Sequence, residues 1–374
     1  MEYVQEGIAT LHEYGDTIPN APTDAATVVV PMTQREHAGL AAERVLSALE
    51  AVDPERVVVP LRAAPDRVES VVEWLSGFDI PLSVLWCDGP RLESLLSEAG
   101  LNGTRGKGRD VWLALGIASE SEYVVVHDAD AKTYDESHVP KLLFPLANGK
   151  AFSKGYYARV ENNRLYGRLF RLLYRPLIEA LSTGDDAAVI EYLGAFRYAL
   201  AGEFATTGRI ARKLRIQRGW GLEVGTLGEA FRLVGTGGSA QVDLGVHEHD
   251  HRAVSGPSGL SEMASQVTSA LLRAVEENGG DPAYETLDGR YRRAAEQLID
   301  AYALDAGFNG LAYDRGAELE QVDAYADSIG VPGADTRLPA WESVDLSPTT
   351  VAAAVGEDLD EATDGGEALA PQFG

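Results

Sequence analysis

Ser121-Glu-Tyr-Val-Val-Val-His-Asp-Ala-Asp130 is the stretch of sequence on which the fold depends. Its apolar, β-branched run Tyr123–Val126 has no turn residue, which is typical of a strand buried on both faces of a parallel sheet. Ligands of open α/β sheets bind beyond the carboxyl ends of the strands. Asp128 and Asp130, two residues apart at such an end, can both reach one Mg²⁺ or Mn²⁺ ion that also holds a diphosphate. The alternative interpretation is a solvated acidic turn.

The residues before this stretch alternate between apolar strands and amphipathic helices. Such alternation predicts the α/β class, with a doubly wound parallel sheet of nucleotide-binding character. The predicted strands are Ala26–Pro31, Arg56–Leu61 and Leu82–Trp86, and the predicted helices are Ala38–Ala51, a helix from Pro65 to Leu75, Arg91–Ala99 and Asp110–Ser119.

The composition of the 374 residues argues against several classes of protein. Hydrophobic residues make up 45%, enough for one large domain with an appended piece, or for two domains. The net charge of −26 argues against a general nucleic-acid surface and against adhesion to anionic membranes. Because the acidic residues are scattered, we hypothesise a protein adapted to high salt, and full stability at low KCl would contradict this.

Cys87 is the only cysteine, so the sequence excludes an intramolecular disulfide and a cysteine-based zinc site. The sequence shows no secretory leader and no run of about 18 apolar residues. We therefore expect a cytoplasmic protein with no stable membrane insertion.

Gly106-Lys107-Gly108 precedes the predicted helix that leads into the opening stretch. One interpretation is a flexible turn with a lysine that faces solvent. The other is a cation carried to phosphate oxygens near a helix start by a backbone that glycine permits. The segment is not a Walker loop, because the Gly-Lys-Ser/Thr part is absent.

A basic amphipathic helix is predicted to run to about Leu181, and Pro176 should kink or split it. It contains Arg168, Arg171 and Arg175. These cations form either a solvated basic face or a contact with an anionic substrate.

Glu223 begins a predicted helix within Gly219–Gly225, where the helix dipole also favours an acid as a cap. His247, His249 and His251 alternate at strand period, so they are expected to share one face. The histidines are either a surface cluster, or one imidazole completes the metal site of the two aspartates, a mixed oxygen and nitrogen set that suits Mn²⁺.

The remaining segments are predicted from periodicity and composition. The C-terminal end is acidic low-complexity sequence, which we expect to be disordered. The apolar stripes of the C-terminal helices fit burial within one subunit, and they also leave open a homodimer. The predictions are a helix over 138–150, a strand over Ala151–Val160, a turn over Ala201–Thr207, and helices over Leu260–Glu277, Tyr284–Leu304 and Glu318–Ile329.

Taken together, these motifs resemble those of the glucosyl-3-phosphoglycerate synthases, a family of retaining glycosyltransferases with the GT-A fold. The resemblance covers roughly residues 28–252. Its motifs, in chain order, are the strand ending at Pro31, Gly106–Gly108, Asp128–Asp130, Gly167-Arg168, Arg175–Leu177, Leu200–Glu203, Gly219–Gly225, and Gln241–Val246 ahead of the histidines and Arg252.

The resemblance implies a role for each matching residue. The cation would neutralise charge on the leaving diphosphate, and an arginine fork suits an anionic acceptor. The implied metal ligands are Asp128, Asp130 and His249, and the implied catalytic residues are Glu223, Asp130 and Lys107. The implied nucleotide-sugar site is Pro31, Met32, Thr33, Gln34, Lys107, Asp128, Ala129, Asp130 and Glu223, and the implied acceptor site is Gly167, Arg168, Leu169, Phe170, His247, His251 and Arg252.

The sequence departs from the family in three places. Met32-Thr-Gln-Arg-Glu36 replaces an Asn-Glu-Glu-like motif, His247 stands where the family has an arginine, and Phe170 where it has a threonine. The last two fall at the expected acceptor site. The expected organisation is a lead-in (1–25), a GT-A domain (26–255) with a donor half (26–135) and an acceptor half (136–255), a helical region (256–340) and the tail (341–374).

The predicted function is metal-dependent, retaining transfer of glucose from UDP- or GDP-glucose to 3-phosphoglycerate or a similar small anionic acceptor. Mg²⁺ or Mn²⁺ is the expected cofactor, and the product would serve compatible-solute synthesis. Three alternatives are mannosyl transfer to (phospho)glycerate, a polyprenyl-phosphate glycosyltransferase, and a non-catalytic nucleotide-sugar binding protein. The sequence shows no C-terminal membrane anchor for the second, and Asp128, Asp130 and His249 together disfavour the third.

Overall fold

A computed structural model describes residues 4–15, 17–161, 163–248, 257–363 and 369–371. Nine strands of this described part form one sheet in the order β1-β11-β7-β10-β6-β2-β4-β3, and β5 also pairs with β4. All pairings are parallel except those of β10, which is antiparallel to β6 and β7. The strands are β1 (Ala9–Leu11), β2 (Ala26–Val29), β3 (Met32–Thr33), β4 (Arg56–Arg62), β5 (Leu82–Trp86), β6 (Tyr123–Val126), β7 (Phe152–Ala158), β10 (Phe204–Thr207) and β11 (Ser239–Val246), with a separate hairpin of β8 (Val160–Glu161) and β9 (Arg164–Leu165).

The strands expected before Asp128 are present as β2, β4, β5 and β6, and the later one as β7. Several strands were not expected, among them β1 and β10. β1 lies in the predicted lead-in and pairs with β11, and β10 lies where a turn is predicted. That turn prediction is wrong because Phe204–Thr207 is hydrogen-bonded on both sides, to β6 and β7. Neighbouring strands, more than its own composition, make this segment a strand.

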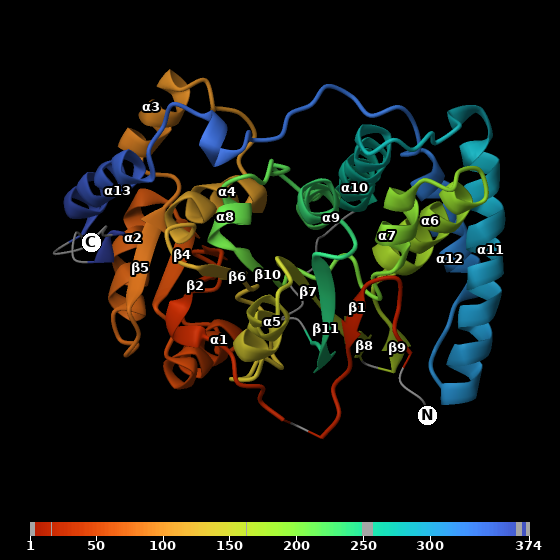
Figure 1. Cartoon of the computed structure of the whole chain (residues 1–374), viewed down its shortest axis with the longest axis horizontal. Helices are drawn as coiled ribbons and strands as arrows, with labels where there is room; N and C mark the ends of the chain where they lie inside the picture. The colour runs from red at the N-terminus through yellow and green to blue at the C-terminus, as the bar shows by residue number, and fades with distance from the viewer. Residues whose placement is uncertain (1–3, 16, 162, 249–256, 364–368, 372–374) are drawn as a thin grey trace.

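Helices cover both faces of the sheet, with α4, α8 and α9 over one face and α1 and α5 over the other (Figure 1). Within the described residues, no helix is both long and apolar enough to cross a membrane. The helices are α1 (Leu40–Val52), α2 (Pro65–Leu75), α3 (Pro90–Glu98), α4 (Lys107–Ala118), α5 (His138–Ala147), α6 (Arg175–Ser182), α7 (Ala188–Gly194), α8 (Gly208–Ala211), α9 (Leu222–Val234), α10 (Pro257–Glu277), α11 (Tyr284–Asn309), α12 (Arg315–Ala326) and α13 (Pro348–Ala362).

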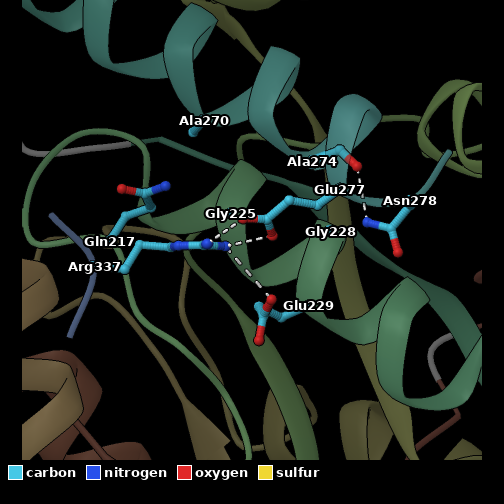
Figure 2. A pocket seen from close by; sticks show the side chains of 9 residues that line it. All are labelled: Gln217, Gly225, Gly228, Glu229, Ala270, Ala274, Glu277, Asn278 and Arg337. Atoms are coloured by element: carbon cyan, nitrogen blue, oxygen red, sulfur yellow. Dashed lines mark hydrogen bonds and ion pairs between the residues drawn. The ribbon is translucent and has the colours of Figure 1, made fainter. Parts of the chain in front are cut away.

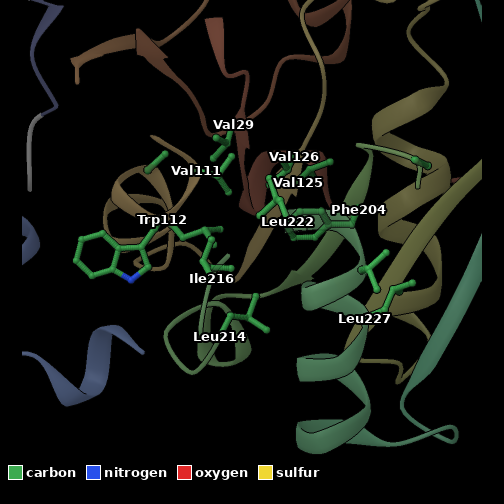
Figure 3. Close-up of a cluster of buried hydrophobic side chains, with 14 of the residues drawn as sticks. Val29, Val111, Trp112, Val125, Val126, Phe204, Leu214, Ile216, Leu222 and Leu227 are labelled. Carbon is green, nitrogen blue, oxygen red and sulfur yellow. The ribbon is translucent and has the colours of Figure 1, made fainter. Parts of the chain in front are cut away.

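The core lies between the sheet and the helices α4 and α9. α4 is buried on all sides from Gly108 to Ala118, and from Val111 onward its residues are apolar all round. Figure 3 shows the meeting of side chains from the sheet (Val29, Val125, Val126), from α4 (Val111, Trp112) and from α9 (Leu222, Leu227).

Near Pro176 the basic helix is divided into a π-helical and an α-helical part, without a break in helical geometry. A π-helical segment, Leu169–Tyr174, is followed by α6, with the proline in its first turn. Proline has no N–H to donate to the Leu172 carbonyl four residues earlier. The hydroxyl of Tyr291 on α11 donates to that carbonyl instead, at 2.6 Å.

Arg171 of the basic helix is not part of a solvated basic face. Its guanidinium makes two hydrogen bonds, of 2.9 and 2.7 Å, to the buried carboxylate of Glu318 on α12. The hydroxyl of Tyr313 also donates to Glu318, at 2.6 Å. This cation therefore holds the C-terminal helices to the rest of the chain.

The prediction of a disordered tail is wrong for α13. This helix packs against α2, α3, α4 and β5 and lies beside the donor half (Figure 1). Before it, Leu338 pairs with Ile216, and the Trp341 ring stacks on Trp112 of α4 with centroids 4.2 Å apart. The alanines and valines of α13 give it an apolar face that the acidic composition conceals.

Asp358 joins α13 to the start of α3. Its buried carboxylate accepts hydrogen bonds from the backbone N–H groups of Arg91 and Leu92, at 3.1 and 3.2 Å, and pairs with the Arg91 guanidinium at 3.3 Å. A carboxylate in this position satisfies donors at a helix N-terminus and complements the helix dipole.

We expect Asp358→Ala to lower the free energy of unfolding by about 1–3 kcal/mol, because buried N–H donors lose their acceptor. Urea denaturation would measure the change. Asp360→Ala, which removes an exposed carboxylate of the same helix, is the control and should change stability little. Equal effects of the two substitutions would contradict the capping role.

Candidate active site

Three elements bring predicted residues to one edge of the sheet. β6 ends two residues before Asp128, Lys107 begins α4, and Glu223 lies in the first turn of α9. Lys107 Nζ lies 2.5 Å from Asp128 Oδ1 and 3.2 Å from Glu223 Oε1. Burial lowers the pKa of Lys107, but the two carboxylates outweigh it and hold the pKa above its ordinary value. The ammonium group is therefore charged and offsets part of the acidic charge at this edge.

The glycines on either side of Lys107 allow close contact with the segment that precedes α9. A Cβ on Gly106 would lie 2.7 Å from the Arg218 carbonyl oxygen, and a Cβ on Gly108 would overlap the Gln217 carbonyl. The Gly108 N–H donates to the Arg218 carbonyl at 3.2 Å. Gly-Lys-Gly is therefore a packing motif that joins α4 to the chain leading into α9, and the flexible-turn interpretation is wrong.

The Asp128 carboxylate lies against a turn at the start of β10. A Cβ on Gly202 would collide with this carboxylate. Lys154 of β7 holds the turn, because its ammonium donates to the Ala201 carbonyl, and the next residue of β7 donates its N–H to the Glu203 carbonyl at 2.9 Å. The turn and β7 thus fix the space that Asp128 occupies.

Lys154 is a buried cation that sequence reasoning missed. Burial lowers its pKa to about 8, although Glu223 and Glu203 raise it. Lysine is rarely fully buried without paired groups, so a single lysine in a strand is normally expected to reach solvent. The acidic residues around Lys154 come from three separate segments of chain, so the sequence next to Lys154 does not reveal them.

The loop after Asp130 contacts the segment that leads to the predicted metal histidine. The Lys132 N–H donates to the Glu248 carbonyl at 2.8 Å, and the Glu248 N–H donates to Thr133 Oγ1 at 3.3 Å. Glu248 immediately precedes His249 in the sequence. The chain therefore enters the segment that contains His249 beside the D-x-D loop.

The donor atoms of Asp128 and Asp130 suit a divalent cation, because Mg²⁺ and Mn²⁺ prefer carboxylate oxygens. Within the described ranges, no three His, Cys, Asp or Glu side chains gather closely enough to hold a metal ion. The third expected ligand, His249, lies outside the described residues, as do His251 and Arg252. β11 ends at Val246, so the expected strand alternation of the histidines stays a prediction.

The loop predicted to bind the nucleotide follows β2 at the same edge of the sheet. After Pro31, Met32 and Thr33 form β3, which pairs with the end of β4. Gln34 Oε1 accepts a hydrogen bond from the Ala64 N–H at 2.8 Å. These contacts hold the loop in place, and its role in binding the nucleotide stays a prediction.

The predicted acceptor residues meet in a cluster of aromatic rings. Gly167 has a φ of 76°, and a Cβ there would lie 3.6 Å from the Tyr198 ring. The Phe170 ring lies 5.1 Å from the Tyr198 ring, and the buried His247 ring stacks on Tyr157 with centroids 4.0 Å apart. Tyr157 and Tyr198, 5.1 Å apart, join the two groups. Sequence reasoning missed both tyrosines, because buried aromatic residues are usually core.

The other predicted acceptor residues on this segment differ in exposure. Arg168 is exposed and Leu169 is half-buried. In the predicted donor site, Ala129 is buried. Arg175 donates to the Gly194 carbonyl at 3.0 Å. Of the basic helix, Arg168 is thus the side chain that faces solvent most openly.

An ion-pair network holds α9, the helix that carries Glu223 (Figure 2). Buried Glu229 accepts hydrogen bonds from Arg215 at 3.0 Å and from Arg232 at 2.7 Å. Figure 2 shows Arg337 pointing between Glu229 and Glu277, at 3.6 and 2.5 Å. Burial raises the pKa of Glu229, but the hydrogen bonds from the arginines outweigh it and hold the pKa below 4.5.

The chain is similar to known proteins that share one name. It is 35% identical over 375 residues to the glucosyl-3-phosphoglycerate synthase of Methanococcoides burtonii, which covers 91% of this chain and 93% of the relative. It is 35% identical over 322 residues to that of Persephonella marina, which covers 81% of this chain and 79% of the relative. No family model matches the chain.

The chain is also similar to solved structures of proteins with this name. Glucosyl-3-phosphoglycerate synthase from Mycobacterium tuberculosis, in complex with Mn²⁺, UDP and phosphoglyceric acid, is 26% identical with a TM-score of 0.54, over 71% of this chain and 86% of that chain. The complex of that enzyme with Mg²⁺ and UDP has the same TM-score and identity. The predicted α/β fold of GT-A type with a helical C-terminal part is thereby confirmed.

We expect Gly202→Ala to weaken binding of Mn²⁺ by about 10- to 100-fold, because the added methyl group displaces the Asp128 carboxylate. Calorimetric titration with Mn²⁺ would measure the affinity. Gly237→Ala is the control, since a Cβ there meets open space. Unchanged Mn²⁺ affinity in Gly202→Ala would show that Asp128 is not held by this turn or does not bind the ion.

We expect Glu229→Gln to lower the free energy of unfolding at pH 7 by about 2 kcal/mol, because the charge-assisted hydrogen bonds from Arg215 and Arg232 are lost or weakened. The pKa of Glu229 is lower in the folded than in the unfolded chain, so its contribution is complete above pH 4.5 and disappears as the pH falls through the folded value. Urea denaturation of wild type and variant from pH 7 downward should show the difference shrinking below pH 4.5. A difference that grows toward low pH would contradict the assignment.

Proposed function

The chain belongs to the glucosyl-3-phosphoglycerate synthase family, and we propose that it transfers glucose from a nucleotide diphosphate glucose to 3-phosphoglycerate. The observation that carries the proposal is the 35% identity that extends over 91% of this chain. The proposal is supported by a second observation: Lys107 contacts both Asp128 and Glu223 at the carboxyl edge of the sheet. Ligands of open α/β sheets bind at this edge.

In this proposal the donor diphosphate lies beside Lys107. Asp128, Asp130 and His249 would hold the Mg²⁺ or Mn²⁺ ion, which when bound would offset the negative charge that develops on the leaving diphosphate. The Lys107 ammonium, already charged between two carboxylates, would add a hydrogen-bond donor for a phosphate oxygen. Glu223 would accept hydrogen bonds from the sugar hydroxyls and so orient the glucose.

The acceptor would lie over the segment that begins at Gly167, close to the aromatic cluster. A reaction that retains configuration needs no covalent intermediate on a protein carboxylate if the acceptor hydroxyl attacks from the face on which the diphosphate leaves. The departing phosphate oxygen then takes the hydroxyl proton. In this scheme the protein binds and orients both substrates and excludes water from the glucose.

The proposal extends to the setting of the enzyme. The net charge of −26 supports a cytoplasmic enzyme of a high-salt cell, whose product serves as a compatible solute. Leu304 and Phe308 on α11, 77% and 89% exposed, support a homodimer. Light scattering of the purified chain would reject the homodimer by finding the mass of a monomer.

We expect UDP-glucose or GDP-glucose and 3-phosphoglycerate, in high KCl with Mn²⁺, to give glucosyl-3-phosphoglycerate, detected by mass spectrometry. EDTA should abolish the product. Asp128→Asn should lower kcat/KM by at least about 100-fold, because the cation loses a charged ligand. Asp360→Asn, on the exposed side of α13, is the control and should keep full activity.

Two results would contradict the proposal. Product formed from GDP-mannose but not from either glucose donor would establish the mannosyl alternative. Binding of donor and metal with no turnover in wild type, and equal binding in Asp128→Asn, would establish a non-catalytic nucleotide-sugar binding protein.

A further inference from the structure

We propose that Arg159 binds an anionic group of the acceptor, and that the hydroxyl of Tyr198 holds its guanidinium in place. The inference deepens the proposed function and rests on it, since the acceptor of that reaction carries both a carboxylate and a phosphate. Arg159 lies at the end of β7, between that strand and the β8–β9 hairpin.

The hairpin brings Arg159 to the predicted acceptor segment. The Tyr166 N–H donates to the Arg159 carbonyl at 3.1 Å, which closes the base of the hairpin one residue before Gly167. Arg159 Nη1 donates to Tyr198 Oη at 3.1 Å. The same hydroxyl would lie 3.6 Å from a Cβ on Gly167, so the guanidinium and the Gly167 backbone both lie close to one tyrosine hydroxyl.

The cluster around Tyr198 also connects Arg159 to the donor side. Burial raises the pKa of Tyr157 well above its ordinary value, Glu203, Tyr198 and Asp128 raise it further, and Arg159 lowers it. Tyr157 is thus within electrostatic range of both Asp128 and Arg159. The Tyr157 ring lies 5.1 Å from that of Tyr198 and stacks on His247, so an acceptor held by Arg159 would lie beside the chain that leads toward the predicted metal histidine.

Of the other cations near this segment, Arg168 is exposed, and Arg171 and Arg175 bind protein groups. Arg171 is bound on both sides of its fork by Glu318, and Arg175 donates to the Gly194 carbonyl and lies 3.4 Å from Glu179. His247, which replaces a family arginine, is buried in a ring stack. Arg159 is half-buried, and its planar fork of N–H donors matches a carboxylate or a phosphate.

The alternative is that Arg159 only ties the hairpin to Tyr198. A structural role would lower the melting temperature and disturb donor and acceptor alike. A binding role would act on the acceptor alone, which kinetics with both substrates separates.

The test compares Arg159→Gln with Arg164→Gln, an exposed arginine of the same hairpin. We expect Arg159→Gln to raise KM for 3-phosphoglycerate about 10- to 100-fold, with KM for the donor, Mn²⁺ affinity and kcat little changed, and Arg164→Gln to resemble wild type. Arg159→Lys should recover part of the loss. If Arg159→Gln does not fold, Tyr198→Phe replaces it and should raise KM for the same acceptor by a smaller factor.

Two truncated acceptors identify the anionic group. Glycerol 3-phosphate lacks the carboxylate, and glycerate lacks the phosphate. If Arg159→Gln raises KM for 3-phosphoglycerate and glycerol 3-phosphate but not for glycerate, Arg159 binds the phosphate. If it raises KM for 3-phosphoglycerate and glycerate but not for glycerol 3-phosphate, Arg159 binds the carboxylate. Equal KM values of wild type and Arg159→Gln for all three acceptors, or an equal rise in donor KM, would overturn the inference.

Failure of the proposed function has a separate signature. Wild type that transfers glucose to none of the three acceptors contradicts that function, whereas normal transfer by Arg159→Gln contradicts only the role of Arg159. Calorimetric titration of wild type and Arg159→Gln with 3-phosphoglycerate tests binding without turnover. Equal affinities there would also overturn the inference.

Discussion

Lys107 forms ion pairs with Asp128 and with Glu223, which lies 116 residues further along the chain. Carboxylates that gather at one sheet edge repel each other strongly in surroundings of low dielectric constant. Lys107 lies between two of them, and Lys154 lies beneath the same group, with Glu203 and Glu223 raising its pKa. The arrangement of the site depends on these two ammonium groups, because without them the acidic side chains would separate or take up protons.

Backbone contacts fix the positions of the segments that carry these charged side chains. Gly106 and Gly108 let the start of α4 touch the Gln217 and Arg218 carbonyls, and Gly202 lets the turn before β10 touch Asp128. At each of these points a Cβ would push the two contacting segments of chain apart. The second face of α4 is held by the stacking of Trp341 on Trp112, so the helix that carries Lys107 is supported on both sides.

Periodicity predicted the first half of the sheet correctly, because β2, β4, β5 and β6 are apolar runs separated by amphipathic helices. It failed for β10, whose pairing comes from strands on both sides, and for α13, whose acidic surface conceals an apolar face. For the site, the Gly-Lys-Gly, D-x-D and Gly219–Gly225 motifs contain Lys107, Asp128 and Glu223, which do meet. Lys154, Tyr198 and Arg159 gave no signal, because their importance comes from neighbours that lie far away in sequence.

The carboxylate of Asp358 completes the start of α3 from 267 residues further along the chain. During synthesis the donor half leaves the ribosome long before this carboxylate and the Trp341 ring do. Part of the apolar surface of β5, α3 and α4 therefore stays uncovered until Trp341 and α13 have been synthesised. Folding around α3 is therefore tied to a segment that is synthesised 267 residues later.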